Sequence, residues 1–299
     1  MIAEYADLRR GIVVRGAGLA RSRFALSSGT VVPIPQQGLQ YHPNARIPST
    51  PWRDVTPREY RMLCGPSMHS TPWRHHADVA VLRVADDLLA PLREICHDCG
   101  YYRTPTGADP RQHPAWAAAL EDLVEALACY RVEGAPIDAS ALYRAEAGQA
   151  AVTRTNREVP GSELTLGLHV DSWEGTPLRY RASVRNRLCI NLGHEPRYLA
   201  FINLTLADVL RAVEPRDATD LEAISLFAGH EFMARCPHYP VTRLRLDPNE
   251  LYIAPTGNMI HDGVAPEGVQ PDVALHLLGF FAPPSMCAAA GREQYADRR

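Results

Sequence analysis

The chain has 299 residues, of which 46% are hydrophobic and 22% charged, and all 31 of its Lys+Arg residues are arginine. The absence of lysine excludes Schiff-base aldolases, pyridoxal phosphate enzymes and Walker A loops, because each of these uses a lysine amine. The formal net charge of -3, without a long run of either sign, gives no electrostatic footprint for nucleic acid or anionic lipid. We therefore expect a small-molecule partner, no nucleic acid and no membrane.

Terminal segments and cysteine content indicate the cellular compartment of the protein. Residues Met1 to Arg10 are charged and have no apolar stretch behind them, so we expect no signal peptide. The apolar-leaning stretch from Val273 to Gly291 is interrupted by His276 and a pair of prolines, which leaves too little for a membrane span. An odd number of scattered cysteines, 7 in all, is not a disulfide framework. These features predict a cytoplasmic protein.

The first 139 residues predict strands, loops and then helices that pack on the core. Short β-type runs occur at Gly11–Val14 and Thr30–Ile34, among many prolines. Thr56 followed by Pro57 is typical of a helix start, and apolar residues recur at helical spacing over Ala85–Cys96 and Pro114–Tyr130. We expect this helical layer of residues 57 to 130 to form part of a lid over a substrate.

From residue 140 the pattern changes to strand-length runs separated by turn residues, with helices expected at Leu206–Val213 and Thr219–Phe227. The expected strands are Ala141–Ala145, Ala150–Thr155, Thr165–Val170, Leu188–Leu192, Tyr198–Leu204, Thr242–Leu246, Glu250–Ala254 and Val273–Phe281. Eight short strands favour a sandwich or jelly roll. The prediction is a mainly β protein with flanking helices: a double-stranded β-helix core over residues 140–285, a tail over 286–299, and one compact domain overall.

One group of residues has the composition of a metal site. His169 and Asp171 are two apart on a predicted strand, so their side chains point to the same face. A second such pair, His76 with Asp78, lies in a polar stretch, whereas His169 ends an apolar strand, and His261 follows another buried strand downstream. A jelly roll brings such segments together at its mouth as a two-histidine, one-carboxylate triad. His230, by contrast, is interpreted as a loop residue.

The spacing of His169, Asp171 and His261, followed by a final apolar strand, resembles the iron(II)/2-oxoglutarate-dependent oxygenases of the double-stranded β-helix fold, over about residues 140 to 283. The resemblance implies that these three residues hold Fe(II), with 2-oxoglutarate and O2 as cosubstrates. It implies hydrogen abstraction from a small molecule, an amino acid or a biosynthetic intermediate, with hydroxylation as the default outcome. Desaturation and oxidative cyclisation share this first step. A carboxylate at Asp171 argues against halogenation.

The same resemblance requires a cation for the distal carboxylate of 2-oxoglutarate. Most members place an arginine on the last strand, but Val264 to Pro284 contains none, and only His276 is partly basic there. In demethylase-like members a lysine follows a hairpin, and Arg197 stands at the similar position of this chain, with Arg187 as its competitor. Asn191 is a further candidate donor to the cosubstrate.

Each of these residues also has a simpler interpretation. Arg197 then is a solvated turn residue, Arg187 pairs with an acid of the helical layer, His276 is a satisfied core histidine and Asn191 ends a strand ladder. For the whole chain, one alternative is a cupin-like metalloenzyme that uses the three ligands without 2-oxoglutarate. The other is a metal-free jelly-roll binding protein. The sequence specifies no oligomeric state.

Overall fold

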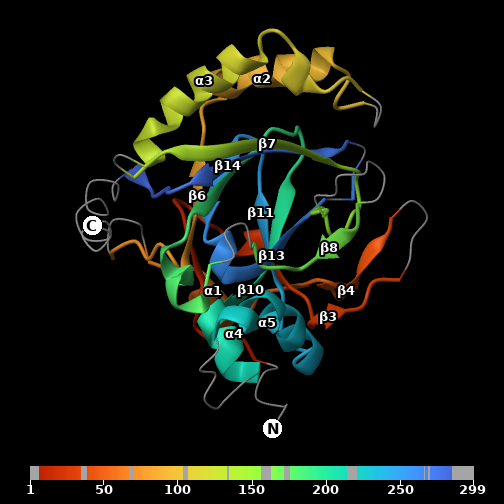
Figure 1. Ribbon diagram of the computed structural model, residues 1–299, viewed down its shortest axis with the longest axis vertical. Helices are drawn as coiled ribbons and strands as arrows, with labels where there is room; N and C mark the ends of the chain where they lie inside the picture. The colour runs from red at the N-terminus through yellow and green to blue at the C-terminus, as the bar shows by residue number, and fades with distance from the viewer. Residues whose placement is uncertain are drawn as a thin grey trace.

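The fold is described from a computed structural model of the chain (Figure 1). It describes residues 7–34, 39–66, 71–103, 107–132, 135–155, 163–171, 176–213, 221–265, 267–268 and 270–284. The predicted tail of residues 286–299 lies outside the described residues.

Two facing sheets form the core. Their strands, in chain order, are β7 Ile137–Ala145, β8 Thr165–Gly167, β9 Asn186–Asn191, β10 Arg197–Thr205, β11 Thr242–Leu246, β12 Glu250–Ala254, β13 Met259–Val264 and β14 Asp272–Gly279. One sheet has the order β12-β9-β14-β7 and the other β13-β10-β11, to which a bridge between His169 and His261 joins the end of β8. Successive strands alternate between the two sheets, except that β10 and β11 are antiparallel neighbours in one sheet, with two helices between them in the chain. This winding is a double-stranded β-helix, which confirms the predicted fold class.

The N-terminal region extends both sheets rather than forming a separate layer. Its strands are β1 Val13–Arg15, β2 Phe24–Leu26, β3 Thr30–Val31, β4 Tyr41–Pro48, β5 Arg53–Asp54 and β6 Asp78–Arg83. Strands β1 and β6 continue the first sheet beyond β12, and β2 and β5 continue the second beyond β11. Strand β4 pairs in parallel with β8 and in antiparallel with β3. The interior between the sheets is therefore filled from both halves of the chain.

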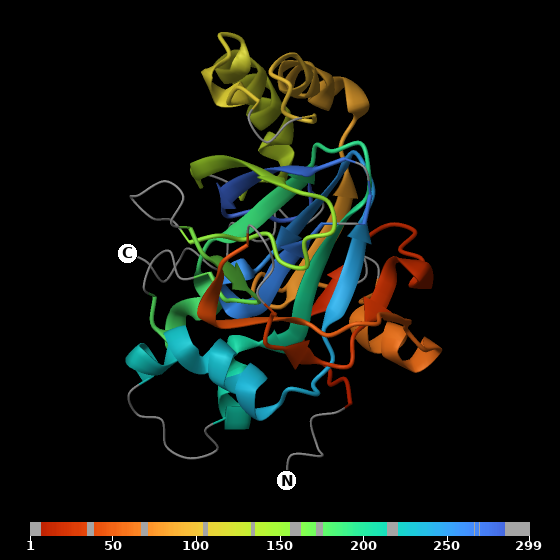
Figure 2. The same cartoon turned by 90° about the vertical axis from the view of Figure 1, so that its right-hand side faces the viewer.

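The helices pack against the two sheets. They are α1 Pro57–Leu63, α2 Asp86–Asp98, α3 Trp116–Ala126, α4 Leu206–Val213 and α5 Leu221–Arg235, with short 3-10 helices η2 Arg21–Arg23, η3 Pro110–Gln112, η4 Leu127–Tyr130, η5 Leu178–Ser183 and η6 Thr256–Asn258. Helices α2 and α3 lie at one end of the molecule beyond β7 and β14, and α4 and α5 at the opposite end (Figure 1). The view turned by 90° shows the same separation (Figure 2).

Apolar contacts explain these positions. Outward-facing Leu188 and Ile190 of β9 belong to one buried cluster with Leu89 and Leu92 of α2. Ile202 of β10 belongs to a second cluster with α4 and α5 on the outer face of the other sheet. Because strand residues alternate between faces, the sheet separates α2 and α3 from the barrel interior. The expected lid over the substrate is therefore wrong for these two helices.

Two strand predictions also need correction. Ala150–Thr155 is not a strand; among its residues only Arg154 makes an isolated bridge, to Thr165. Conversely, Met259–Val264, which was not among the expected strands, is strand β13. Its antiparallel pairing with β10 stabilises the extended conformation. Among the described residues, no helix is both long and apolar enough to cross a membrane.

Candidate metal centre

A glycine directs the chain into the first two candidate ligands. Gly167 ends β8 with a φ of 70°, and a Cβ there would lie 2.4 Å from the carbonyl oxygen of Arg46 on β4. Only glycine accommodates both the positive φ and this close approach. The amide of Leu168 then donates to the same carbonyl at 2.8 Å. This local turn places His169 and Asp171 just beyond the end of β8, whereas the predicted strand extended to Val170.

His261 is joined to His169 through the backbone. The amide of His169 donates to the carbonyl of His261 at 3.0 Å, and the amide of His261 donates back at 2.8 Å. The two rings lie 4.8 Å apart, centroid to centroid. The structure thus brings together the three residues that the sequence predicts as metal ligands. One ligand atom from each lies within 4.8 Å of the others.

Both histidines are oriented by backbone carbonyl groups. Nδ1 of His169 lies 2.8 Å from the carbonyl oxygen of Gly167, and Nδ1 of His261 lies 3.2 Å from that of Met259. A carbonyl only accepts, so each Nδ1 carries the proton and each Nε2 is a free lone pair in the neutral ring. The Nε2 atoms lie 3.5 and 3.8 Å from the carboxylate of Asp171. Hydrogen bonds from the other ring nitrogen to a backbone carbonyl orient metal-binding histidines in many proteins.

The three side chains are buried, with exposed fractions of 9% for His169, 6% for Asp171 and 3% for His261. Burial raises the pKa of Asp171, but the charges of Arg187 and His261 outweigh it and hold that pKa well below its usual value. Burial lowers the pKa of His261 to about 3, against the opposing effect of Asp171. Burial also disfavours the charged form of His169, yet the negative charges of Asp171 and Asp262 nearby leave its pKa raised. The centre therefore holds a carboxylate that favours a cation between the rings.

Arg187, on β9, contacts the carboxylate of the candidate centre. Its Nη2 donates to Oδ2 of Asp171 at 2.7 Å, and its Nη1 donates to Nδ1 of His276 at 2.8 Å. The guanidinium has no acceptor, so His276 carries its proton on Nε2. That Nε2 is buried without a partner, and burial together with Arg187 and Arg197 lowers the pKa of His276 well below its usual value. His276 is thus a neutral donor that borders a cavity of about 50 Å3.

Arg197 faces the same interior from the start of β10. It is 3% exposed, so it is not the solvated turn residue of the simpler interpretation. Its Nη1 donates to Sγ of Cys189 at 2.6 Å, and its Nε lies 3.1 Å from the carboxylate of Asp272. Asn191, in contrast, is used in the turn after β9. Its amide group donates to the carbonyls of Glu195 and Leu246 and accepts from the amide of Gly193.

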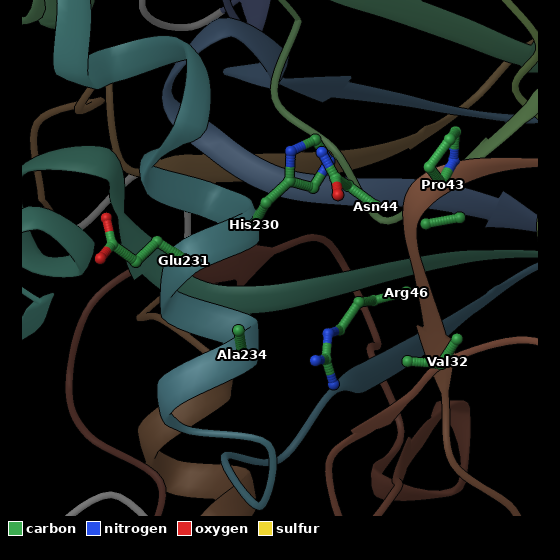
Figure 3. A pocket seen from close by; sticks show the side chains of 8 residues that line it. Val32, Pro43, Asn44, Arg46, His230, Glu231 and Ala234 are labelled. Carbon is green, nitrogen blue, oxygen red and sulfur yellow. The ribbon is translucent and has the colours of Figure 1, made fainter.

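A hollow beside the centre was not predicted from the sequence. It has a volume of about 330 Å3 and lies between β4 and α5, with Asn44 and Arg46 on one side and His230 on the other (Figure 3). His230 belongs to helix α5, so its interpretation as a loop residue is wrong. Burial lowers the pKa of His230, with further contributions from His42 and His169. Arg46, which lines the hollow, accepts a hydrogen bond from the amide of Leu168, the residue before His169, so the hollow lies near the candidate ligands.

No protein-family model and no curated protein sequence matches the chain. Solved structures do resemble it. The Kdo hydroxylase KdoO, a non-haem Fe(II) alpha-ketoglutarate-dependent dioxygenase in complex with alpha-ketoglutarate and Fe(III), is 12% identical, covers 73% of this chain and 86% of its own, and gives a TM-score of 0.35. HygX from Streptomyces hygroscopicus, with nickel and 2-oxoglutarate bound, is 12% identical, covers 69% and 82%, and gives 0.32. Similarity at this level carries no information about the function of this chain.

The residues of the centre fit a divalent transition metal. Two neutral imidazoles and one carboxylate on one face are the donor set of the facial triad that binds non-haem Fe(II) and leaves positions open. The unpartnered Nε2 of His276 fits an anionic or carbonyl ligand in the interior, because a buried donor without an acceptor is costly. The arrangement can therefore hold a metal and an oxygen-rich ligand beside it.

Proposed function

We propose that the chain is a cytoplasmic, non-haem Fe(II)/2-oxoglutarate-dependent oxygenase that acts on a small molecule, an amino acid or a biosynthetic intermediate. His169, Asp171 and His261 are the proposed iron ligands. The observation that carries the proposal is the convergence of two oriented Nε2 atoms and one buried carboxylate on a single point. Three protein ligands leave positions for 2-oxoglutarate and O2. Bound iron supplies, with these cosubstrates, the abstraction of a hydrogen atom from an unactivated C–H bond, with hydroxylation as the default outcome.

The protein groups keep the ligands in their coordinating form. The carbonyls of Gly167 and Met259 hold the Nδ1 protons of the two histidines, so the Nε2 lone pairs stay directed at the centre. Arg187 fixes one oxygen of Asp171 and keeps the carboxylate ionised. Burial of all three side chains excludes bulk water from the ligand atoms. These contacts are preorganised before any ligand enters.

Arg197 and His276 are the proposed holders of the distal carboxylate of 2-oxoglutarate. Arg187 touches Asp171 directly and so lies at the level of the metal ligands. Cys189 is the next residue of β9 on the same face, roughly 6.6 Å further along the strand. Arg197 donates to Cys189, and His276 on β14 is the cross-strand partner of Cys189. Both residues therefore lie further from the metal ligands along the strand direction than Arg187 does. A guanidinium and a neutral N–H are suitable partners for a carboxylate.

The charges of the interior favour a dianion once a metal is bound. Asp171 is balanced by Arg187, and Asp272 by Arg197, so these four buried groups are neutral together. A divalent metal adds two positive charges in a buried site, where uncompensated charge is costly. The two carboxylates of 2-oxoglutarate would restore neutrality. This balance supports 2-oxoglutarate over a neutral or singly charged cosubstrate.

The metal ligands are tested by anaerobic titration with Fe(II) and 2-oxoglutarate, which should give the weak visible absorption band of the chelate. His169→Ala and Asp171→Ala should abolish bound iron, measured by metal analysis of folded protein. His230→Ala is the matched control, because this histidine lies near the centre outside the triad, and it should retain iron. An equal amount of bound iron in the wild type and in Asp171→Ala would contradict the proposal and favour the metal-free binding protein.

The cosubstrate site is tested separately. Arg197→Met combined with Asp272→Asn removes both charges of the buried pair, so that no unpaired carboxylate is left in the interior. The 2-oxoglutarate concentration for half-maximal succinate release should rise about tenfold or more, with iron affinity nearly unchanged. The same effect in Arg187→Met, without loss of iron, would place the anchor at Arg187 instead. Iron binding without any succinate release would favour the cupin-like metalloenzyme.

A further inference from the structure

A second hollow, larger than the first, lies at the end of the barrel that carries the candidate metal ligands. It has a volume of about 910 Å3 and is bordered by the start of β1, by α1 and by the start of α4. Thr205, the last residue of β10, and Asn258, which directly precedes β13, contribute to its lining. We call it the arginine groove, because its charged lining is dominated by Arg10, Arg15, Arg61, Arg74 and Arg211.

Two carboxylates compensate only part of this charge. Asp78, which is fully buried, pairs with both Arg15 at 2.8 Å and Arg74 at 2.7 Å. Asp208, the acidic residue of the lining, pairs with Arg211 at 2.7 Å. Five guanidinium groups facing two carboxylates leave an excess of three positive charges. In a chain whose formal net charge is -3, this is a local concentration of the opposite sign.

Two of the arginines are available to a ligand. Among the residues that the structure describes, neither Arg10 nor Arg61 has an ion-pair or hydrogen-bond partner through its side chain, and both are exposed. Arg15, in contrast, is 4% exposed and is held by hydrogen bonds to the carbonyls of Thr71 at 2.9 Å and Pro72 at 3.0 Å. The groove therefore combines a rigid buried cation with two exposed ones whose donors are unused.

We infer that the arginine groove binds a small molecule that carries two or more neighbouring anionic groups, such as a pyrophosphate, a phosphate ester or a polycarboxylate. Guanidinium groups match phosphate and carboxylate oxygens with paired hydrogen bonds. The volume of the groove lies in the range of small-molecule sites. Because the negative net charge of the chain opposes nucleic acid, a small anion fits the groove better than a polyanion. The inference stands without the metal centre.

The experiment is calorimetric titration of the metal-free protein at low salt with two probes, pyrophosphate and citrate. Metal-free protein is required because both probes bind metals. Wild type should bind at least one probe saturably, with an affinity that falls as salt rises. Tighter binding of pyrophosphate assigns the groove to phosphate-type ligands, and tighter binding of citrate to polycarboxylates.

The variants separate the groove from other anion sites. Arg10→Ala with Arg61→Ala should weaken the preferred probe about tenfold or more, since each removes a charge-assisted hydrogen bond. Arg58→Ala is the matched control: Arg58 is exposed on the same helix α1 as Arg61 but does not line the groove. It should change the affinity less than about twofold. Asp171→Ala should bind the probe like wild type, which keeps this test independent of the proposed iron site.

Three results would overturn the inference. One is no saturable binding of either probe by wild type. Another is an equal loss of affinity in Arg58→Ala and in the double variant, which would indicate a diffuse charge effect. The third is tighter binding of a short single-stranded RNA than of either small anion, which would assign the groove to nucleic acid. The thermal unfolding temperature of each variant, compared with wild type, shows that the folded protein was titrated.

Discussion

At the residue scale, Gly167 couples the backbone to the candidate metal ligands. Its positive φ and its close approach to Arg46 both depend on the missing Cβ. Its carbonyl also holds the Nδ1 proton of His169. We expect Gly167→Ala to lower the free energy of unfolding by about 1–3 kcal/mol, measured by urea denaturation, and to weaken iron binding.

Gly148 is the matched control for that substitution. It has a φ of 78°, but nothing lies within 4 Å of a Cβ built there. Gly148→Ala therefore tests backbone strain alone, and it should leave iron binding unchanged. If the two variants weaken iron binding equally, the position of the Gly167 carbonyl does not matter for His169.

Arg187 is a positioning residue that acts through Asp171. Removing its hydrogen bond to Oδ2 frees the carboxylate to rotate away from the histidines. We expect Arg187→Met to weaken iron binding about 10–100-fold, the usual effect of losing a hydrogen bond that holds a metal ligand in place. Arg187→Lys should recover part of this loss, because it restores a donor. Anaerobic iron titration measures both, and unchanged affinity in Arg187→Met would contradict the role.

At the element scale, a capping box starts helix α1. The hydroxyl of Thr56 accepts from the amide of Glu59 at 3.3 Å, and the amide of Thr56 donates to the Glu59 carboxylate at 2.8 Å. The sequence pair Thr56-Pro57 predicted this helix start correctly. Arg53 donates two further hydrogen bonds to the same carboxylate. Thr56→Ala should therefore lower the free energy of unfolding by about 0.5–2 kcal/mol.

The same helix start gives a prediction for pH. Hydrogen bonds from Arg53, against a smaller opposing effect of burial, lower the pKa of Glu59 to about 2. A carboxyl with a lowered folded-state pKa stabilises the fold above its ordinary pKa, and the stabilisation is lost as pH falls towards the folded value. Glu59→Gln should thus be less stable than wild type near pH 7, with the difference vanishing by about pH 2. Glu94, which is exposed, is the control for loss of a surface carboxylate: Glu94→Gln should change the free energy of unfolding at pH 7 by less than about 0.5 kcal/mol.

At the scale of the whole molecule, α2 and α3 stabilise a sheet rather than cover a substrate. Leu89 of α2 is fully buried in the cluster on the outer face of that sheet, whereas its neighbour Leu88 is 36% exposed. Leu89→Ala should lower the free energy of unfolding by about 2–5 kcal/mol, and Leu88→Ala by less than about 0.5 kcal/mol. Neither should change iron affinity in the folded protein. A selective change in iron affinity with Leu89→Ala would contradict the outer-face position.

Strands with clear alternation were predictable to the residue. Thr242–Leu246 and Glu250–Ala254 have the expected bounds, because their apolar residues alternate or run together between turn residues. Strand β13 was missed, since Asp262 and Gly263 are local turn formers, and only pairing with β10 keeps the segment extended. His230 was misplaced for a related reason: the predicted helix ended at Phe227, whereas α5 continues to Arg235. The local sequence pattern does not show the tertiary contacts that extend a helix or a strand.

The sequence by itself showed the absence of lysine, predicted the β-rich core and identified His169, Asp171 and His261 as one group. It could do so because periodicity and residue chemistry are local properties. The tertiary structure decided what depends on faces and partners. It buried Arg197 with Asp272, paired Arg187 with Asp171 and turned α2 and α3 away from the interior. It also gathered Arg10, Arg61 and Arg211 into one groove. These residues are far apart along the chain, and only the packing of the two sheets and their helices determines which of them meet.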